Sequence, residues 1–404
     1  MLSFPKDFFW GSATSAYQVE GNNFCSDWWE WEKNLELEKR SGKACLHYEL
    51  YKEDFNLAKF LNHNAHRLSI EWSRVESKEG FFLDKELRHY LEVIEYLREL
   101  RIEPIVTLHH FTNPLWLAKQ GGWENKNSVF YFLRYVERLI HLLCEKVRFW
   151  ITINEPIVYT YHGYIVGIWP PQIRSLWRAR RVIENLTLAH IKAYKLIHNI
   201  YKRKKLNPPY VSIAQNLIAF VPCSLNLKNR FATYLRDRFY NFGLIERLIR
   251  AKSLDFIGIN YYTRNLIDVV DFKFQNLCLD SCSRHNLLEK NSLGWEIYPE
   301  GLYDLLMRLK RYKLKIFILE NGICTENDGL RWEFIYRHLE NICHAIQEGA
   351  EILGYLYWSL LDNYEWDKGF LPRFGLIAVD YLNYRRTIRE SAKRFALVCQ
   401  SGSL

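Results

Sequence analysis

Short apolar segments alternate along this chain with longer segments that carry polar residues at regular intervals. Eight of the short segments are rich in apolar and β-branched residues and have the length of buried strands. We expect these strands at residues 8–12, 66–70, 104–108, 147–153, 210–216, 255–260, 315–320 and 354–359. The pattern therefore predicts a succession of strands separated by long connections.

The longer segments repeat their apolar residues every three or four positions, as amphipathic helices do. Leu87, Tyr90, Leu91, Ile94 and Leu97 show this repeat clearly. Helices are expected at residues 84–101, 128–146, 183–205, 234–251, 300–312 and 331–349. Because no linker rich in Pro, Gly or Ser interrupts the alternation, we predict an α/β fold, a single (β/α)8 TIM barrel that forms one domain over residues 1–404. The active site of such a barrel lies at the C-terminal ends of its strands.

Composition agrees with an ordinary globular protein. The chain has 404 residues, of which 49% are hydrophobic and 25% are charged. Aromatic residues are unusually frequent, at 16%, with 14 Trp. Most of these rings are expected in the core, and a few could serve as stacking platforms for the flat apolar face of a ligand.

The formal net charge of +9 comes partly from basic clusters at residues 174–181 and 202–205, in or next to a predicted helix. A solvated helix face explains such clusters better than nucleic-acid binding, because no binding motif accompanies them. No apolar run reaches the length of a membrane span, and the first residues lack the pattern of a signal peptide. We therefore expect no nucleic-acid partner and no membrane partner. The sequence does not indicate an oligomeric state.

Nine cysteines are scattered along the chain. Their odd number favours free thiols in a reducing compartment over a disulfide framework. Cys278 and Cys282 are the closest pair, but no second pair matches them, and the side chains of the neighbours His109 and His110 are expected to point in opposite directions. The sequence therefore predicts a cytoplasmic protein without a metal or another cofactor.

Two glutamates stand where predicted strands end. Glu155 lies in the string Thr-Ile-Asn-Glu-Pro at 152–156, and Glu320 lies in the string Ile-Leu-Glu-Asn-Gly at 318–322. A single Glu at a strand end is usually a solvated loop residue. Two carboxyl groups at one end of a barrel are what hydrolysis of a glycosidic bond requires, because one protonates the leaving oxygen and the other stabilises or attacks the sugar carbon.

Polar and aromatic residues lie within or just after nearly every other predicted strand. They are Gln18, Arg67, His110, Asn260, Tyr262, Trp358, Glu365 and Trp366. Because parallel strands of a barrel end on the same side, these residues and the two glutamates are expected to line one pocket.

The strings together resemble family 1 glycoside hydrolases, which are retaining β-glucosidases and β-galactosidases built on a (β/α)8 barrel. The resemblance extends from about residue 8 to 384 and rests on four strings in the family's order, at 18–21, 152–156, 318–322 and 358–366. It implies a retaining exo-β-glycosidase that acts on unphosphorylated β-glucosides or oligosaccharides, with tolerance for β-galactosides or β-fucosides, and that uses no cofactor.

By this resemblance Glu155 is the general acid/base and Glu320 is the nucleophile. Arg67 and Tyr262 are the neighbours of Glu320 in the family and would favour its charged form, and Asn260 supports the same centre. The charge on Glu320 would raise the pKa of Glu155 and keep it protonated until the glycosyl-enzyme forms. The alternative for Arg67 is a buried ion pair with another carboxylate.

The resemblance also assigns the contacts to the sugar. Its hydroxyl-directed and stacking residues are Gln18, His110, Asn154, Glu365 and Trp366, with Trp358 beneath the ring. Trp295 resembles the family's aromatic residue on the leaving-group side, although it could also be a rim residue packed on its own loop. His109 precedes the matching His110 and is expected in the core.

The subgroup that acts on 6-phosphoglucosides is not favoured. Those enzymes replace the glutamate at the position of Glu365 with Ser and hold the phosphate with a Lys and a Tyr further on. Here Glu365 is kept, and Arg373-Phe374 stands where the Lys and Tyr would be expected. A carboxylate that faces a phosphate dianion is repulsive, so we expect an unphosphorylated sugar.

Some positions depart from the family pattern. The segment 217–254 looks shortened, and the segment 264–293 does not align with the family. His66, Phe111 and the run Trp169-Pro170-Pro171-Gln172 replace residues that are usual in the family. These changes concern the walls and mouth of the pocket and leave the preference for a leaving group open.

Two other functions fit the same barrel. A transglycosylase differs from a hydrolase only in the acceptor that intercepts the intermediate. A sugar-binding pseudoenzyme usually lacks one of the two carboxyl groups, whereas Glu155 and Glu320 are both present. A thioglucosidase is disfavoured because such enzymes typically lose the glutamate at the position of Glu155.

Overall fold

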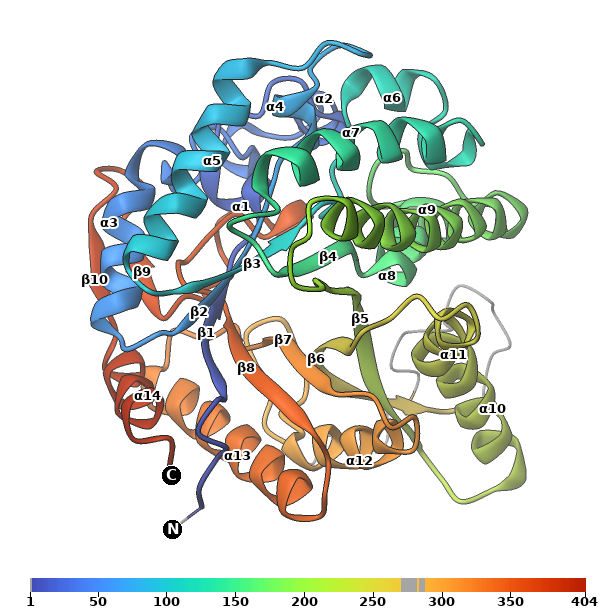
Figure 1. Cartoon of the computed structure of the whole chain (residues 1–404). Helices are drawn as coiled ribbons and strands as arrows, with labels where there is room; N and C mark the ends of the chain where they lie inside the picture. Colours follow the sequence, from blue (N-terminus) through green and yellow to red (C-terminus); the bar gives the residue numbers. More distant parts are fainter. Residues whose placement is uncertain (1, 270–281, 283–287) are drawn as a thin grey trace.

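The structure is a computed structural model that describes residues 2–269, 282 and 288–404. Within these residues, eight parallel strands pair in the order of the sequence, and β8 pairs with β1 to close a barrel. Helices follow the strands and form a layer around the barrel (Figure 1). The predicted (β/α)8 barrel is confirmed.

Each barrel strand begins within two residues of its predicted start. The strands are β1 Phe9–Ala13, β2 Ala65–Ser69, β3 Glu103–Thr107, β4 Phe149–Asn154, β5 Tyr210–Pro222, β6 Ile257–Ile267, β7 Ile316–Asn321 and β8 Ile352–Trp358. β5 and β6 continue beyond their predicted ends and pair with each other there, Phe220 opposite Asn265. A small antiparallel pair, β9 Ile377–Val379 and β10 Arg386–Ile388, lies outside the barrel.

The predicted helices occur, with one interruption and additional short helices. The α-helices are α1 Ala16–Glu20, α2 Asp27–Glu32, α3 His47–Phe60, α4 Trp72–Val75, α5 Asp84–Glu99, α6 Leu115–Lys119, α7 Ser128–Leu143, α8 Pro156–Thr160, α9 Leu176–Arg203, α10 Leu227–Asp237, α11 Gly243–Arg250, α12 Pro299–Lys310, α13 Asp328–Gln347 and α14 Glu390–Ser401. The 3-10 turns are η1 Leu37–Lys39, η2 Gly122–Glu124 and η6 Trp366–Lys368. The π-helical turns are η3 Tyr161–Val166 and η4 Arg238–Phe242.

Two of the predicted helix boundaries are wrong. α9 begins earlier than predicted, because the hydroxyl of Ser175 accepts a hydrogen bond from the N–H of Arg178 at 3.4 Å and so caps the helix. The single helix predicted at 234–251 is instead the end of α10, which begins already at Leu227, followed by the π-turn η4 and α11. A three- to four-residue repeat continues across these elements, so periodicity alone does not reveal the break.

Aromatic rings fill the barrel near the N-terminal ends of the strands. Phe9 of β1 packs on Phe149 of β4 and Phe317 of β7, with ring centroids 5.2 and 5.8 Å apart. Successive strand residues alternate between this interior and the layer under the helices, as Ile105 and Val106 do in β3. These apolar rings fill one end of the barrel interior, and polar side chains occupy the other end.

The chain termini lie side by side below α14 (Figure 1). The N–H of Phe4 donates to the carbonyl of Gly402 at 2.9 Å. No helix in the described part of the chain is long and apolar enough to cross a membrane.

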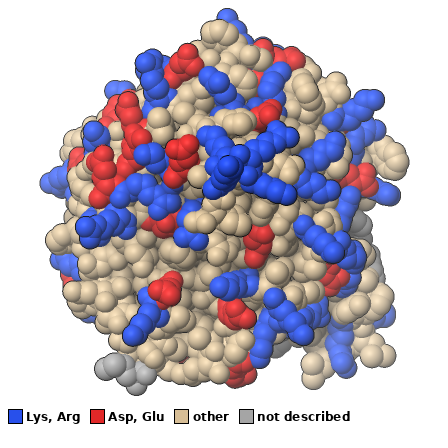
Figure 2. Space-filling model, viewed as in Figure 1, with Lys and Arg blue, Asp and Glu red and all other residues tan. Residues whose placement is uncertain are grey.

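Basic side chains outnumber acidic ones on the face drawn in Figure 2, in keeping with the net charge of +9. The two basic clusters lie at the ends of α9 and are partly paired, Arg178 with Glu124 at 2.6 Å and Lys204 with Glu145 at 3.5 Å. Exposed pairs of this kind contribute about 0–1 kcal/mol each, so they support a solvated helix surface.

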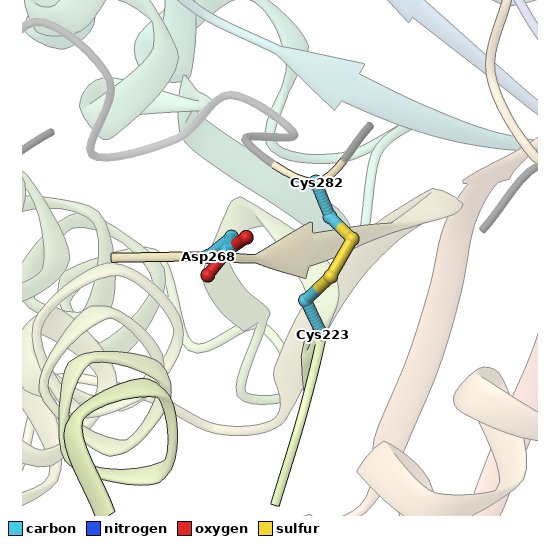
Figure 3. A group of neighbouring side chains, drawn as sticks. All are labelled: Cys223, Asp268 and Cys282. Carbon is cyan, nitrogen blue, oxygen red and sulfur yellow. A yellow bond between two sulfur atoms is a disulfide. The ribbon is translucent and has the colours of Figure 1, made fainter. Parts of the chain in front are cut away.

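Two cysteines form a disulfide, so the prediction of free thiols is wrong for them. Cys223 directly follows β5, and its Cα atom lies 5.9 Å from that of Cys282, 59 residues further on (Figure 3). The extension of β5 beyond its predicted end brings Cys223 to this place. The described cysteines that remain free are Cys25, Cys45, Cys144, Cys324, Cys343 and Cys399, and Cys278 lies outside the described residues.

Because two of the cysteines form a disulfide, the cysteines no longer support a reducing compartment. The cytoplasmic location stays a prediction. Asp268, just after β6, lies beside the two cysteines (Figure 3). Because the two sulfur atoms are bonded to each other, this group does not offer a metal ion the thiolate ligands that it prefers.

Candidate active site

Irregular pairing occurs at the ends of β4 and β7, next to the two glutamates, and in β7 it turns the glutamate toward the barrel axis. In β7, Phe317 and Leu319 face the barrel interior, so strict alternation would turn Glu320 outward. The register of β7 against β8 shifts between Ile318 and Asn321, and Glu320 lies in the cavity. A similar shift between Ile151 and Asn154 precedes Glu155. Such bulges are common next to active sites because they redirect a side chain.

The backbone of Glu155 is held in an uncommon conformation. Its φ is +41°, in the left-handed region, and its N–H donates to the carbonyl of Ala214 in β5 at 2.7 Å. Pro156 follows as the first residue of α8, where its fixed φ suits a helix start. A non-glycine residue costs about 1–3 kcal/mol in this region, and such residues cluster at functional sites.

Glu320 is surrounded by donors from other strands. The guanidinium of Arg67 in β2 forms an ion pair with one carboxylate oxygen, and the hydroxyl of Tyr262 donates to the other at 2.5 Å. Arg67 is fully buried and is itself oriented by Thr107 at 2.9 Å and by Asn154 at 2.7 Å. The predicted neighbours of Glu320 therefore contact it, and Arg67 pairs with this carboxylate rather than with another.

Glu155 is surrounded by amides instead of cations. Asn260 in β6 donates to its Oε1 at 2.7 Å, and Asn216 in β5 donates to the same oxygen at 3.2 Å. Asn260 also donates to Oδ1 of Asn154 at 3.3 Å, which links the surroundings of the two glutamates. An amide stabilises a carboxylate less strongly than a guanidinium does.

The two carboxyl groups therefore differ in how easily they ionise. Burial and the charge of Glu320 raise the pKa of Glu155, and the two amides only partly oppose this. Burial also raises the pKa of Glu320, but there Arg67 and Tyr262 act in the opposite direction. When only one proton is shared by the pair, it resides on Glu155, because Glu320 faces the positive charge.

Both glutamates line a cavity of about 580 Å³, which is large enough for a small ligand. The predicted site residues that line it are Gln18, His110, Asn154, Glu155, Tyr262, Trp295, Glu320, Trp358, Glu365 and Trp366. Arg67 and Asn260 lie behind this surface, in contact with the glutamates.

Several polar groups at the cavity have unused hydrogen-bonding capacity. Within the described residues, Oε1 of Gln18 and Nδ1 of His110 are buried and have no hydrogen-bond partner. Gln18 is held by donation from its Nε2 to the carbonyl of Tyr364 at 2.8 Å and to Glu365 at 3.3 Å. Buried polar groups are nearly always paired, so these atoms indicate places for ligand hydroxyls.

The pKa values of His110 and Glu365 are shifted from their usual values. Burial and the charge of Arg67 keep the pKa of His110 well below its usual value, so its ring is neutral. Burial, followed by the charge of Glu320, raises the pKa of Glu365 to about 8. His109, in contrast, bonds to Asn113 at 3.1 Å and Trp123 at 3.2 Å in the core, as predicted.

Aromatic rings form the walls of the cavity. His110 stacks on Trp358, with centroids 5.9 Å apart, and on Trp366, with centroids 6.1 Å apart. On another side, Trp295 packs against Tyr262 at 5.7 Å and Phe374 at 6.3 Å. The polar residues and glutamates thus lie between apolar faces, an arrangement suited to a sugar.

The sequence model of the family described as Glycosyl hydrolase family 1 matches residues 1–243 and 232–403. This chain belongs to glycosyl hydrolase family 1. It is accordingly a glycosidase, and the resemblance found in the sequence is confirmed.

Relatives in the family share the full length of the chain. A 1,4-beta-D-glucan glucohydrolase of Thermotoga neapolitana is 30% identical over 455 residues, with 100% of each chain covered. A 6-phospho-beta-galactosidase of Clostridium acetobutylicum is 30% identical, over 98% of this chain and 96% of the relative. The solved structure of a beta-glycosidase from Pyrococcus horikoshii is 39% identical with a TM-score of 0.91, over 100% of this chain and 96% of that one.

Within this family the surroundings of Arg373 bear on phosphosugars. Its guanidinium lies 3.5 Å from Asp362, donates to the carbonyl of Val379 at 3.3 Å and covers the ring of Tyr381. Arg373 does not appear among the described residues that line the cavity, whereas its neighbour Phe374 does. The cationic residue at the position where the family's phosphate-binding Lys is expected is therefore engaged elsewhere, and Lys368, which does line the cavity, pairs with Asp367.

Other residues at the cavity were not predicted from the sequence. Asn216 contacts Glu155, and the hydroxyl of Tyr240 in η4 donates to Asn216 at 2.9 Å. Asn216 was the last residue of a predicted strand, the same signal that identified Asn260. Tyr240 carried no such signal, because it lies in a segment that the sequence predicts as an ordinary helix.

Proposed function

We propose that this enzyme is a retaining exo-β-glycosidase that acts on unphosphorylated β-glucosides, with tolerance for β-galactosides. The observation that carries the proposal is the unequal surroundings of Glu155 and Glu320 within one cavity. One carboxyl group is suited to hold a proton, and the other is suited to remain charged. Double displacement through a covalent glycosyl-enzyme requires this pair of states.

In the first step Glu320 bonds to the anomeric carbon while the bond from that carbon to the leaving oxygen breaks. Glu155 gives its proton to that oxygen, so the leaving group departs neutral. The negative charge of Glu320 is consumed in the new ester bond. The pKa of Glu155 then falls, because the charge of Glu320 that helped to raise it is gone.

In the second step Glu155, now ionised, takes a proton from water. The water oxygen bonds to the anomeric carbon and displaces Glu320, which leaves as a carboxylate. Arg67 and Tyr262 stabilise that departing charge through the contacts they already make. Two inversions at one carbon give net retention of configuration.

The sugar ring is proposed to occupy the part of the cavity between Gln18, His110 and Glu365, over Trp358. Gln18 and His110 offer their unused atoms to sugar hydroxyls. Glu365 can bond to sugar hydroxyls, and it offers a phosphate no positive charge: its ionised form would repel the dianion, and its protonated form, favoured by the raised pKa, is only neutral. Glu365 and the engaged Arg373 support an unphosphorylated sugar, although two of the relatives are named a 6-phospho-beta-galactosidase and a 6-phospho-beta-glucosidase.

We further propose that residues 1–404 act as one catalytic domain, because the family match runs across the barrel from its first strand to its last helix. No separate binding module is needed for the reaction described above. The compartment in which the enzyme works stays a prediction from the sequence.

The test is to incubate the protein with aryl β-glucoside, β-galactoside and β-fucoside and to follow the anomeric signals of the product by NMR. Initial formation of the β-sugar supports retention, and initial formation of the α-sugar contradicts it. Binding of these glycosides without turnover would indicate a pseudoenzyme. Adding an alcohol acceptor measures transglycosylation, which is favoured if the alkyl glycoside exceeds the free sugar at low acceptor concentration.

A further inference from the structure

A second amide reaches Glu155 from outside the strings that define the family. Asn216 in β5 donates from Nδ2 to Oε1 of Glu155, 3.2 Å away, and Asn260 donates to the same oxygen from the other side. Among the described residues, no side chain donates a hydrogen bond to Oε2. The two amides therefore select Oε1 as the acceptor and leave Oε2 to carry the proton.

Tyr240 determines which way the amide of Asn216 faces. The Tyr240 hydroxyl donates to Oδ1 of Asn216 at 2.9 Å. Because that oxygen is engaged, the nitrogen of the same amide is turned toward Glu155. An amide without this partner could rotate and present its oxygen to the carboxyl group, and two acceptors in contact would repel each other.

β5 in turn fixes Tyr240. The side-chain amide of Gln215 donates to the carbonyl of Tyr240 at 3.0 Å. The next residue, Asn241, accepts from the N–H of Ile218 at 3.0 Å and donates to its carbonyl at 2.8 Å. These bonds attach the π-turn η4 to the strand that carries Asn216. Such π-turns within helices are frequent at functional sites.

We propose that Asn216 and Tyr240 are positioning residues for the acid/base step, an inference that rests on the proposed function. Asn216 holds the carboxyl group of Glu155 so that Oε2 faces the leaving oxygen. Tyr240 acts through Asn216. The same oxygen gives the proton to the leaving group in the first step and takes a proton from water in the second.

The charges around Glu155 set the direction of the expected titration. Burial and the charge of Glu320 raise the pKa of Glu155, whereas Asn260, Asn216 and Arg67 lower it. Glu365 and Tyr262 also face Glu155 across the cavity. Asn216 donates to the charged form of the carboxyl group, so its removal should raise the pKa of Glu155 further. Replacing Tyr240 with Phe keeps all of these charged groups.

The direct test is an NMR titration of enzyme with glutamate labelled at the side-chain carboxyl carbon. The signal that is lost in Glu155→Gln belongs to Glu155. Asn216→Ala should raise the midpoint of this signal by about one pH unit, the worth of one hydrogen bond to a charged group. Tyr240→Phe should raise it by less. As a control, Tyr194→Phe removes a hydroxyl that donates to Asp255 at 2.7 Å in another part of the barrel and should leave the midpoint unchanged.

A kinetic test separates positioning from a merely structural role. Aryl β-glucosides with phenols of different pKa differ in how much they need a proton from the enzyme. The loss of kcat/KM in Asn216→Ala and Tyr240→Phe should increase with the pKa of the phenol and nearly disappear for a dinitrophenyl leaving group. A role in packing or in binding the leaving group would lower kcat/KM without this trend.

The proposal is overturned if the Glu155 midpoint in Asn216→Ala equals that of the wild type. It is also overturned if the losses are the same for all phenols. A different result addresses the proposed function alone. If the wild type cleaves no β-glycoside and the midpoint still shifts as described, the positioning of the carboxyl group stands and the proposed function is wrong.

Discussion

Two regions of the cavity are built on different principles. The floor, which we define as Arg67, Asn154, Glu155, Asn260 and Glu320, consists of polar groups from β2, β4, β6 and β7 that bond directly to one another. Each carboxyl group has partners from at least two other strands. The geometry of the floor is thus fixed by the closure of the barrel.

The rim is held together mostly by ring contacts. We define it as Phe111, His162, Trp169, Trp295 and Asp367. The indole of Trp169 packs on His162 at 4.4 Å and on Phe111 at 5.1 Å, and its Nε1–H donates to Asp367 at 2.8 Å. These residues come from loops and short turns rather than from strands. Ring packing tolerates exchange of one apolar side chain for another more readily than a network of charged groups does.

The comparison explains two of the places where this chain departs from its family; a third, His66, is buried in β2 and bonds to Thr14 away from the cavity lining. Phe111 and Trp169 are among the positions that differ from the family pattern, and both lie in the rim, in contact with each other. The five floor residues match the pattern. Changes in the rim can therefore alter which leaving groups are accepted without altering the chemistry at the anomeric carbon.

The largest effect is expected in the floor, from Glu320→Ala. Without a nucleophile, kcat on an aryl β-glucoside should fall by at least about 10⁴-fold. Added azide should restore part of the turnover and give an α-glycosyl azide, because azide enters from the face that Glu320 occupied. Product analysis by NMR is the measurement. Full activity without azide would show that Glu320 is not the nucleophile.

A matched pair of substitutions compares a sugar-contacting carboxyl group with a rim carboxyl group. Glu365→Gln should lower kcat/KM for an aryl β-glucoside by about 10²-fold or more, because it weakens contacts to sugar hydroxyls that strengthen in the transition state. Asp367→Asn, two residues further along the chain in the rim, should cost about tenfold or less. Equal losses in the two variants would remove the distinction between the two regions.

The pH dependence tests the surroundings of Glu320. Tyr262 donates to its carboxylate and so lowers its pKa, against the effect of burial. Glu320 must be ionised to attack, so Tyr262→Phe should move the acidic limb of the kcat/KM profile upward by about one pH unit. An acidic limb that stays in place or moves downward contradicts this role of Tyr262.

The smallest effect is expected from Trp295→Ala in the rim. An aromatic contact contributes about 0.5–1.5 kcal/mol, so KM for an aryl β-glucoside should rise by up to about tenfold. A methyl β-glucoside has no ring to stack, and its kinetic constants should change little. Parallel kinetics on the two substrates measure the difference. A comparable loss with the methyl glucoside would place Trp295 in contact with the sugar itself.

Much of the floor could be predicted because strand ends and short strings are local features of the sequence. The strings around Glu155 and Glu320 identify both residues, and the polar residues within or just after other strands identify Arg67 and Tyr262. The separate places of His109 and His110, one in the core and one in the cavity, were also predicted, because only His110 matches the family's histidine.

The site residues and the disulfide that the sequence did not predict depend on contacts between distant segments. Asn216 reaches Glu155 because β4, β5 and β6 lie side by side, and Tyr240 reaches Asn216 because a π-turn interrupts a helix that looks regular in the sequence. The disulfide of Cys223 depends on how far β5 continues beyond its predicted end. None of these features changes the local pattern of apolar residues.

By itself, the sequence determined the barrel and the identity of the two glutamates, because the order of strands and helices and the chemistry at strand ends are properties of short segments. Only the tertiary structure decided where the side chains point. Alternation along β7 would turn Glu320 outward, and the shift of register against β8 turns it toward Arg67 and Tyr262. A bulge arises from pairing with a neighbouring strand, so it becomes visible only when the barrel closes.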